Sequence, residues 1–169
     1  QLRSDGIGDN LFLGSIVALD ADTGDYRWHY QVMPEESWDY NAAMDIVLAD
    51  LEIKGETKKV LMQAPKNGFL YVIDRQTGKL IGADKFSKSN WASKIDLETG
   101  RPVMGEAADY QKRPKHLWPG PIGAHNWQAM AYSPKQKLVF IPEMQHGATY
   151  IKSEMPNLRE NFLNLSIIT

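Results

Sequence analysis

Short runs of apolar and β-branched residues, separated by polar turn clusters, make up most of this chain. Such runs predict short strands, and no long stretch shows the 3.6-residue apolar period of an amphipathic helix. Many short strands joined by short polar turns are typical of an antiparallel all-β protein. The predicted strands are Ser15–Asp20, Met44–Asp50, Lys59–Ala64, Phe69–Asp74, Lys79–Gly82, Gln128–Tyr132 and Lys137–Ile141, the last two joined by a hairpin turn at Ser133–Gln136.

A turn sequence recurs along the chain. Residues 18–28 follow the pattern small-x-Asp-x-x-Thr-Gly-x-x-x-Trp, residues 72–78 repeat its first half, and residues 95–100 repeat its Asp-x-x-Thr-Gly core. In such a turn the Asp accepts backbone N–H groups, the Thr hydroxyl adds a second bond, and the Gly adopts a positive φ. The pattern alone is compatible with a tight hairpin turn and nothing more. The version that ends at Trp28 also places an indole where it can pack against a neighbouring sheet.

Four-stranded units that recur every ~50 residues are typical of a β-propeller. We expect residues 1–31 to end one blade, 43–85 to form one nearly complete blade, 86–125 to be a long active-site loop, and 126–169 to start the next blade. Two adjacent four-stranded units are therefore predicted. Since a closed ring needs at least about four blades, and this length holds about two to three, the repeat favours a fragment of one propeller domain that is inactive alone.

Composition narrows the function classes. The 169 residues are 43% hydrophobic and 24% charged, which indicates a globular chain with room for a core. The net charge is −2 with scattered Lys and Arg, so a nucleic-acid partner is not expected. The absence of cysteine excludes a disulfide framework and a thiolate metal site in this chain. The four histidines show no metal-binding spacing.

The first of three segments with candidate chemistry is 35–42, in which Asp39 stands between Trp38 and Tyr40. Aromatic neighbours would partly desolvate the carboxyl group, which raises its pKa and suits it to act as a base. The alternative is that Asp39 only caps a turn while the two aromatic residues pack in the interior.

The other two segments are 64–69 and 119–127. In the first, proline, asparagine and glycine predict a tight turn that lifts Lys66 out of a strand end, where it can donate to a carbonyl or carboxyl group. The alternative is an exposed hairpin lysine. The second segment is rich in glycine and proline and presents Asn126 and Trp127 at the start of a strand, unless Trp127 belongs to the core.

In this order and spacing, the three segments resemble those of the PQQ-dependent quinoprotein alcohol dehydrogenases, over about residues 8–145. The resemblance implies that Asp39 is the catalytic aspartate and a calcium contact, that Lys66 bonds the quinone oxygens, and that Asn126 and Trp127 contact PQQ. The 18–28 repeat resembles the tryptophan-docking motif that locks adjacent blades of the family's eight-bladed propeller.

Two positions indicate the type within the family. Methanol dehydrogenases typically have Arg at the position of Lys66, whereas the ethanol and quinohaemoprotein types have Lys. Lanthanide-using members have a second Asp where this chain has Asn41, so calcium is the expected ion. The family's upstream Glu and Asn ligands, its disc-forming cysteine pair and the Trp beneath PQQ have no counterparts here, and the resemblance places them before Gln1.

The resemblance implies oxidation of primary, ethanol-like alcohols to aldehydes with PQQ and Ca²⁺. Electrons would pass to cytochrome c, either a separate protein or a haem c domain outside this chain, and the location would be periplasmic. Two rivals are a non-catalytic propeller scaffold of PQQ-like repeats and a related quinoprotein that acts on sugars or methanol. Asp39 together with Lys66 speaks against the scaffold, which keeps the repeat but not the active-site segments.

Overall fold

The computed structural model describes residues 8–152 and 167–168, and apart from one 3₁₀ turn the regular elements of this part are all strands. The all-β prediction is confirmed, and each predicted strand overlaps an observed one. No helix among the described residues is long and apolar enough to cross a membrane. The elements are β1 (Ser15–Leu19), β2 (Tyr26–Gln31), β3 (Val47–Ile53), β4 (Glu56–Gln63), β5 (Phe69–Asp74), β6 (Leu80–Lys85), β7 (Ala92–Ile95), β8 (Pro102–Met104), the 3₁₀ turn η1 (Glu106–Ala108), β9 (Lys115–Leu117), β10 (Ala131–Ser133), β11 (Leu138–Phe140), β12 (Ala148–Tyr150) and β13 (Ile167–Ile168).

The central feature is a four-stranded antiparallel sheet of order β3-β4-β5-β6. Along β5 the side chains of Phe69, Tyr71 and Ile73 are buried, and the residues between them are less so, as the two-residue period of a strand requires. The loop between β3 and β4 is Lys54–Gly55, and both residues have positive φ (53° and 82°). That combination matches the type I′ turn, whose twist suits a two-residue hairpin.

The three Asp-x-x-Thr-Gly turns share one geometry. In each, one Asp oxygen accepts the N–H groups two and three residues further on, and the Thr hydroxyl accepts the N–H two residues beyond it. The glycines have φ of 76°, 75° and 71°. The expected turn chemistry is confirmed at Asp20–Gly24, Asp74–Gly78 and Asp96–Gly100.

Aromatic side chains of β2 join the first hairpin to the next two turns. The Trp28 indole N–H donates to the Arg75 carbonyl oxygen at 3.2 Å, and the indole lies flat against Gly78, where an added Cβ would come within 2.7 Å of the ring. The Tyr30 hydroxyl donates to the Gly100 carbonyl oxygen at 2.7 Å. Trp28 therefore packs against the neighbouring sheet, as its place in the repeat predicted.

Two matched glycine variants test this contact. Gly24 and Gly78 have φ of 76° and 75°, but a methyl group at position 24 would meet nothing within 4 Å, whereas at position 78 it would meet the Trp28 ring. We expect Gly24→Ala to cost about 1–2 kcal/mol for the left-handed backbone alone. Gly78→Ala should cost about 1–3 kcal/mol more, because the indole must move. Urea unfolding of both variants measures the difference in their free energies of unfolding. An equal loss of stability in the two variants would contradict a tight Trp28–Gly78 contact.

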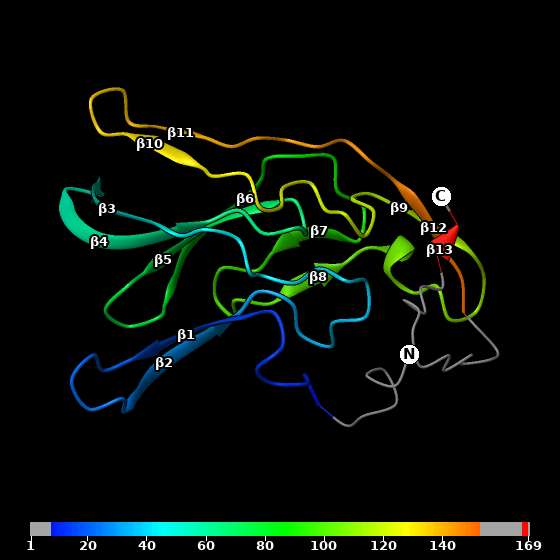
Figure 1. The fold of residues 1–169 in the computed structure, drawn as a ribbon, viewed down its shortest axis with the longest axis horizontal. Coiled ribbons are helices and arrows are strands. Elements are labelled where there is room, and N and C mark those ends of the chain that lie inside the picture. The colour runs from blue at the N-terminus through cyan, green and yellow to red at the C-terminus, as the bar shows by residue number, and fades with distance from the viewer. Residues whose placement is uncertain (1–7, 153–166, 169) are drawn as a thin grey trace.

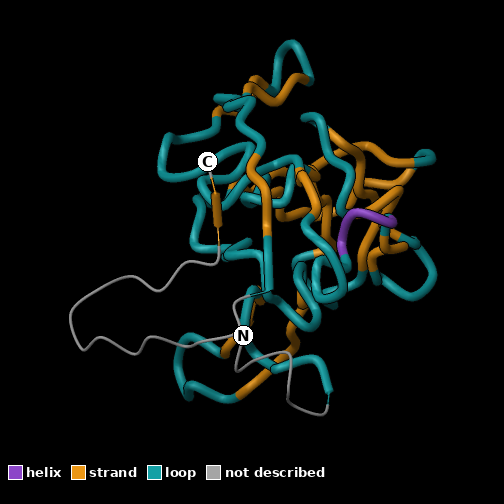
Figure 2. Tube along the Cα trace, turned by 90° about the vertical axis from the view of Figure 1, so that its right-hand side faces the viewer, coloured by secondary structure: helices purple, strands orange, loops and turns teal. Residues whose placement is uncertain are grey.

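The sheets are stacked across the molecule. Figure 1 shows the β1–β2 hairpin, the four-stranded sheet and the β10–β11 hairpin one above another, while β9, β12 and β13 gather at the opposite end. Figure 2 shows the same order from the side, with long loops linking the sheets. The backbone N–H of Met130, just before β10, donates to the Asp45 carboxyl group before β3 at 2.9 Å, which ties these two levels together.

Two organisational expectations need correction. Residues 86–125, predicted as a long loop, contain β7, β8, η1 and β9. The third Asp-x-x-Thr-Gly turn closes a β7–β8 hairpin, and its strands of four and three residues are too short to show a clear apolar alternation. Sequence patterns find strands only when several alternating positions are present.

The second expectation was two adjacent four-stranded units, and the described residues contain one. The described residues form one four-stranded sheet, whereas β1–β2 and β10–β11 are two-stranded, and β12 pairs with β9 instead of extending the β10–β11 hairpin. In β12 the side chains of Ala148 and Tyr150 are buried, and Ala148 lies opposite the buried Leu117 of β9. This apolar pairing carries residues 148–150 back across the molecule to β9, so among the described residues the β10–β11 hairpin stays two-stranded.

Candidate functional site

Asp39 lies in the loop between β2 and β3, in a conformation that exposes its carboxyl group. Its backbone φ is 67°, in the left-handed region, and half of the side-chain surface (50%) is open. Trp38 and Tyr40 are buried and stack on each other with ring centroids 6.3 Å apart. Both rings pack into the core, and the carboxyl group between them is covered over only half of its surface.

Lys66 meets Asp39 at this surface. Its Nζ donates to the Asp39 carbonyl oxygen at 3.1 Å and lies 3.5 Å from Oδ2 of the same residue. The lysine is only 7% exposed, so it is not the exposed hairpin lysine of the alternative interpretation. The structure thus brings together two predicted site residues that are 27 positions apart in the sequence.

The segment 119–127 holds Lys66 from the other side. Gly123 packs so closely that an added Cβ would lie 2.4 Å from the Lys66 Cγ, and the Ala124 N–H donates to the Lys66 carbonyl oxygen at 2.9 Å. His125 is fully buried, with Nδ1 2.6 Å from the Ala64 carbonyl oxygen. These contacts restrict the lysine stem to one path toward Asp39.

Asn126 and Trp127 stand at the outer end of this segment. The Asn126 side chain donates to the Ile122 carbonyl oxygen at 2.9 Å, and Trp127 is 83% exposed, so it does not belong to the core. Within the described part of the chain, no hydrogen bond joins either side chain to Asp39 or Lys66. Both residues connect to the Asp39–Lys66 pair through the backbone of 123–125.

The neighbours of Asp39 are held by hydrogen bonds to residues that the sequence did not assign to the site. The Trp38 indole N–H donates to the Ala108 carbonyl oxygen at 3.1 Å, the Tyr40 hydroxyl donates to a carbonyl oxygen of the 119–127 segment, and the Tyr150 hydroxyl donates to the Trp38 carbonyl oxygen at 2.8 Å. Burial raises the pKa of Tyr40 and of Tyr150, so both hydroxyls stay protonated as donors.

Trp91 forms a buried aromatic cluster with Trp38, Tyr40 and Phe69. The indole is fully buried, its N–H donates to the Asn67 carbonyl oxygen at 2.7 Å, and its ring lies about 6 Å from those of Trp38, Tyr40 and Phe69. The sequence offered one sign of its importance: Trp91 is a large aromatic residue in a segment without strand alternation. Large aromatic side chains bury much apolar surface, so such a residue can anchor a loop to the core.

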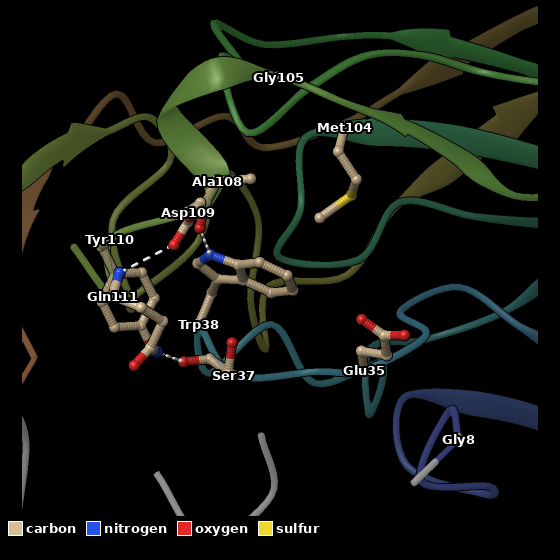
Figure 3. A pocket seen from close by; sticks show the side chains of 10 residues that line it. All are labelled: Gly8, Glu35, Ser37, Trp38, Met104, Gly105, Ala108, Asp109, Tyr110 and Gln111. Carbon is tan, nitrogen blue, oxygen red and sulfur yellow. Dashed lines mark hydrogen bonds between the residues drawn. The ribbon is translucent and has the colours of Figure 1, made fainter. Parts of the chain in front are cut away.

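A separate cavity of about 410 Å³ opens beside the same segment (Figure 3). Ser37 and Trp38 line one side of it, and residues 104–105 and 108–111 line the other, with the Tyr110 hydroxyl donating to the Ser37 carbonyl oxygen at 2.7 Å. Asp39 and Lys66 do not line this cavity. It is therefore distinct from the predicted site.

The acidic groups do not form a metal cage by themselves. Over residues 8–152 and 167–168, no group of three or more His, Cys, Asp or Glu side chains converges as metal ligands would. A calcium ion takes six to eight oxygen ligands. Asp39 can supply part of such a site, and the remaining oxygens must come from elsewhere.

The chain is similar to known proteins over most of its length. A family model described as the β-propeller domain of PQQ glucose/ethanol/alcohol dehydrogenases matches residues 3–85. Quinohemoprotein alcohol dehydrogenase ADH IIB of Pseudomonas putida is 54% identical over 150 residues, which is 89% of this chain and 22% of that protein. The quinohemoprotein alcohol dehydrogenase of Comamonas testosteroni is 49% identical over 142 residues, 84% of this chain and 20% of that protein.

Solved structures show the same likeness. The structure of quinohemoprotein alcohol dehydrogenase ADHIIG from Pseudomonas putida matches with a TM-score of 0.84 and 48% identity, over 87% of this chain and 22% of that one. A europium-containing methanol dehydrogenase matches with a TM-score of 0.81 and 37% identity, over 85% of this chain and 25% of that one. The chain spans 20–22% of the length of the curated relatives cited above.

The stacked antiparallel sheets, the shared turns and the agreement with these structures define part of a β-propeller of the PQQ-binding class. Over most of its length the chain is similar to PQQ-dependent quinoprotein alcohol dehydrogenases.

Proposed function

We propose that this chain supplies part of the cofactor- and substrate-binding face of an enzyme that oxidises alcohols with PQQ. The observation that carries the proposal is the Asp39–Lys66 pair, in which a half-open carboxyl group lies 3.5 Å from a buried ammonium group. Relatives that match most of the chain are named quinohemoprotein alcohol dehydrogenases. A non-catalytic propeller scaffold has no need for a buried lysine held against an aspartate.

Asp39 has the role of general base in this proposal. Its backbone is held by buried neighbours while its carboxyl group stays accessible, so a bound alcohol can approach it and transfer its hydroxyl proton. A base must lie within hydrogen-bond reach of the proton that it takes, and a rigid backbone with an open carboxyl group meets this requirement.

Lys66, Asn126 and Trp127 would hold the cofactor. An ammonium group has three donors, and Asp39 accepts at most two of them, so one donor can reach a quinone oxygen. The exposed Trp127 indole offers a flat apolar surface to a planar ring system. When bound, PQQ would accept the two electrons removed from the alcohol.

The metal and the reaction partners are further parts of the proposal. Asp39 would contact a calcium ion, which acts as a Lewis acid toward the quinone oxygen. Asn41, in place of a second acidic ligand, favours calcium over a trivalent ion. Lys66 favours an ethanol-like primary alcohol over methanol, and cytochrome c would accept the electrons in the periplasm, with any haem c domain outside this chain. The Trp28–Gly78 contact would act as the tryptophan docking between blades.

Removing the Lys66 ammonium tests the cofactor role. In the full-length protein, we expect Lys66→Ala to weaken PQQ binding, or to slow PQQ reduction by ethanol, by about 10- to 100-fold, the usual effect of losing a hydrogen bond to a charged donor. Lys58→Ala is the matched control, since Lys58 lies on β4, away from the Asp39–Lys66 pair, and forms an ion pair with Glu56. Apoenzyme titration with PQQ and stopped-flow spectroscopy measure both steps. Equal behaviour of the two variants would contradict the proposed function.

A further inference from the structure

Glu36 is the most deeply buried acidic side chain near the site, and the proposed reaction does not use it directly. It is 3% exposed, whereas its neighbour Glu35 is exposed. One oxygen, Oε1, accepts the N–H of Trp38 at 2.8 Å and the N–H of Tyr40 at 2.9 Å. The residue enclosed between these two amides is Asp39.

This pair of bonds has a clear conformational consequence. A left-handed φ such as the 67° of Asp39 costs an ordinary residue about 1–2 kcal/mol, so surrounding contacts must hold it. Successive N–H groups that flank a left-handed residue point toward one side and form a concave site for an acceptor oxygen. Glu36 fills that concavity from within the same loop.

The direct alternatives do not fit the burial of Glu36. A side chain that is 3% exposed and already bound to two amides cannot reach an alcohol, and it does not converge with other acidic groups as a metal ligand would in the described part of the chain. Its contacts lead to the backbone on both sides of Asp39. The opposite side of the same backbone is held by the Tyr150 hydroxyl, which donates to the Trp38 carbonyl oxygen.

We infer that Glu36 is a positioning residue for Asp39: by binding the Trp38 and Tyr40 amides, it holds Asp39 in the left-handed conformation that directs its carboxyl group toward Lys66 and the substrate. The inference rests on the proposed role of Asp39 as the base. The Oε1 oxygen of Glu36 holds the two amides as a hydrogen-bond acceptor, and the negative charge of Glu36 is not required for this.

Three single variants of the full-length, PQQ-loaded enzyme test whether kcat depends on the acceptor oxygen of Glu36 or on its charge. Glu36→Gln keeps a carbonyl oxygen at Oε1, Glu36→Ala removes it, and Glu35→Ala is the exposed control. We expect kcat to fall about 10- to 100-fold in Glu36→Ala, as small misplacements of a catalytic group do, with KM changed much less. Glu36→Gln should stay within a few-fold of the parent with an unchanged pH profile, and Glu35→Ala should match the parent.

A double variant distinguishes positioning from a general structural role. If Glu36 acts through Asp39, adding Glu36→Ala to Asp39→Asn should cause no further loss of kcat. A full additional loss in the double variant would overturn the inference, as would a Glu36→Ala enzyme with near-parent kcat, or a Glu36→Gln enzyme as slow as Glu36→Ala. Where Glu36→Ala fails to fold, Glu36→Leu replaces it, because leucine fills more of the buried space and has no acceptor oxygen. Should Asp39→Asn alone leave kcat unchanged, the proposed function itself fails, which is a separate result.

Discussion

Replacing Asp39 with asparagine is expected to lower kcat by about 10²–10⁴ in the full-length enzyme, the usual effect of losing a general base. Asparagine keeps the size and shape of the side chain and tolerates a left-handed backbone, so the loop should retain its conformation. The carboxyl group lies 3.5 Å from the buried Lys66 ammonium, and the asparagine carbonyl oxygen can still accept from that donor. PQQ should therefore still bind while proton removal from the alcohol is lost.

Stopped-flow measurement of PQQ reduction by ethanol, in the variant reconstituted with calcium, checks this expectation. Asp50→Asn is a suitable control, because Asp50 is an exposed carboxyl group on β3 that forms an ion pair with Arg75. If the Asp39→Asn enzyme is fully loaded with PQQ and still reduces it at the parent rate, Asp39 is not the base.

Replacing Trp91 with alanine is expected to lower the free energy of unfolding by about 3–5 kcal/mol, the usual cost of removing a large aromatic side chain from a core. Trp91 is fully buried against three other aromatic rings, and the Asn67 carbonyl oxygen would lose its indole donor. Because two of these rings flank Asp39, the variant should also lose activity at temperatures where it remains folded.

Urea unfolding of the apoprotein measures this loss. Trp91→Phe keeps most of the ring and removes the N–H donor, so it should cost about 1–2 kcal/mol for the lost hydrogen bond, since the Asn67 carbonyl oxygen keeps only the longer bond from the Ser89 hydroxyl at 3.4 Å. Trp127→Ala removes the same kind of side chain from an exposed position and should change the unfolding midpoint little. Similar midpoints for Trp91→Ala and Trp127→Ala would show that the aromatic cluster does not stabilise the fold.

The local turns could be predicted from the sequence alone. Each Asp-x-x-Thr-Gly segment forms the expected turn, because its hydrogen bonds run within five residues and its glycine takes the positive φ that the turn requires. The strands with several alternating positions, such as β5, were also predictable. The pairing of β9 with β12 was not, since these three-residue strands carry no pattern and their contact joins distant parts of the chain.

The site was predictable as a set of residues but not as an arrangement. Sequence and resemblance identified Asp39 and Lys66, and the tertiary structure decided that they touch. Asp39 is half exposed between two buried aromatic residues, because its left-handed φ of 67° turns the carboxyl group away from the core that holds both rings. Neighbours in sequence are therefore a poor guide to the surroundings of a side chain in such a loop.

What the sequence by itself determined was the all-β class, the turns and the identity of the candidate residues, all of which depend on short-range backbone chemistry or on recognisable segments. Only the tertiary structure decided which of two adjacent glutamates, Glu35 and Glu36, is buried beneath Asp39, and that Trp127, for which the sequence left a core position open, is exposed. Burial depends on what distant parts of the chain bring to a position, and residues of the same type carry no local mark of that difference.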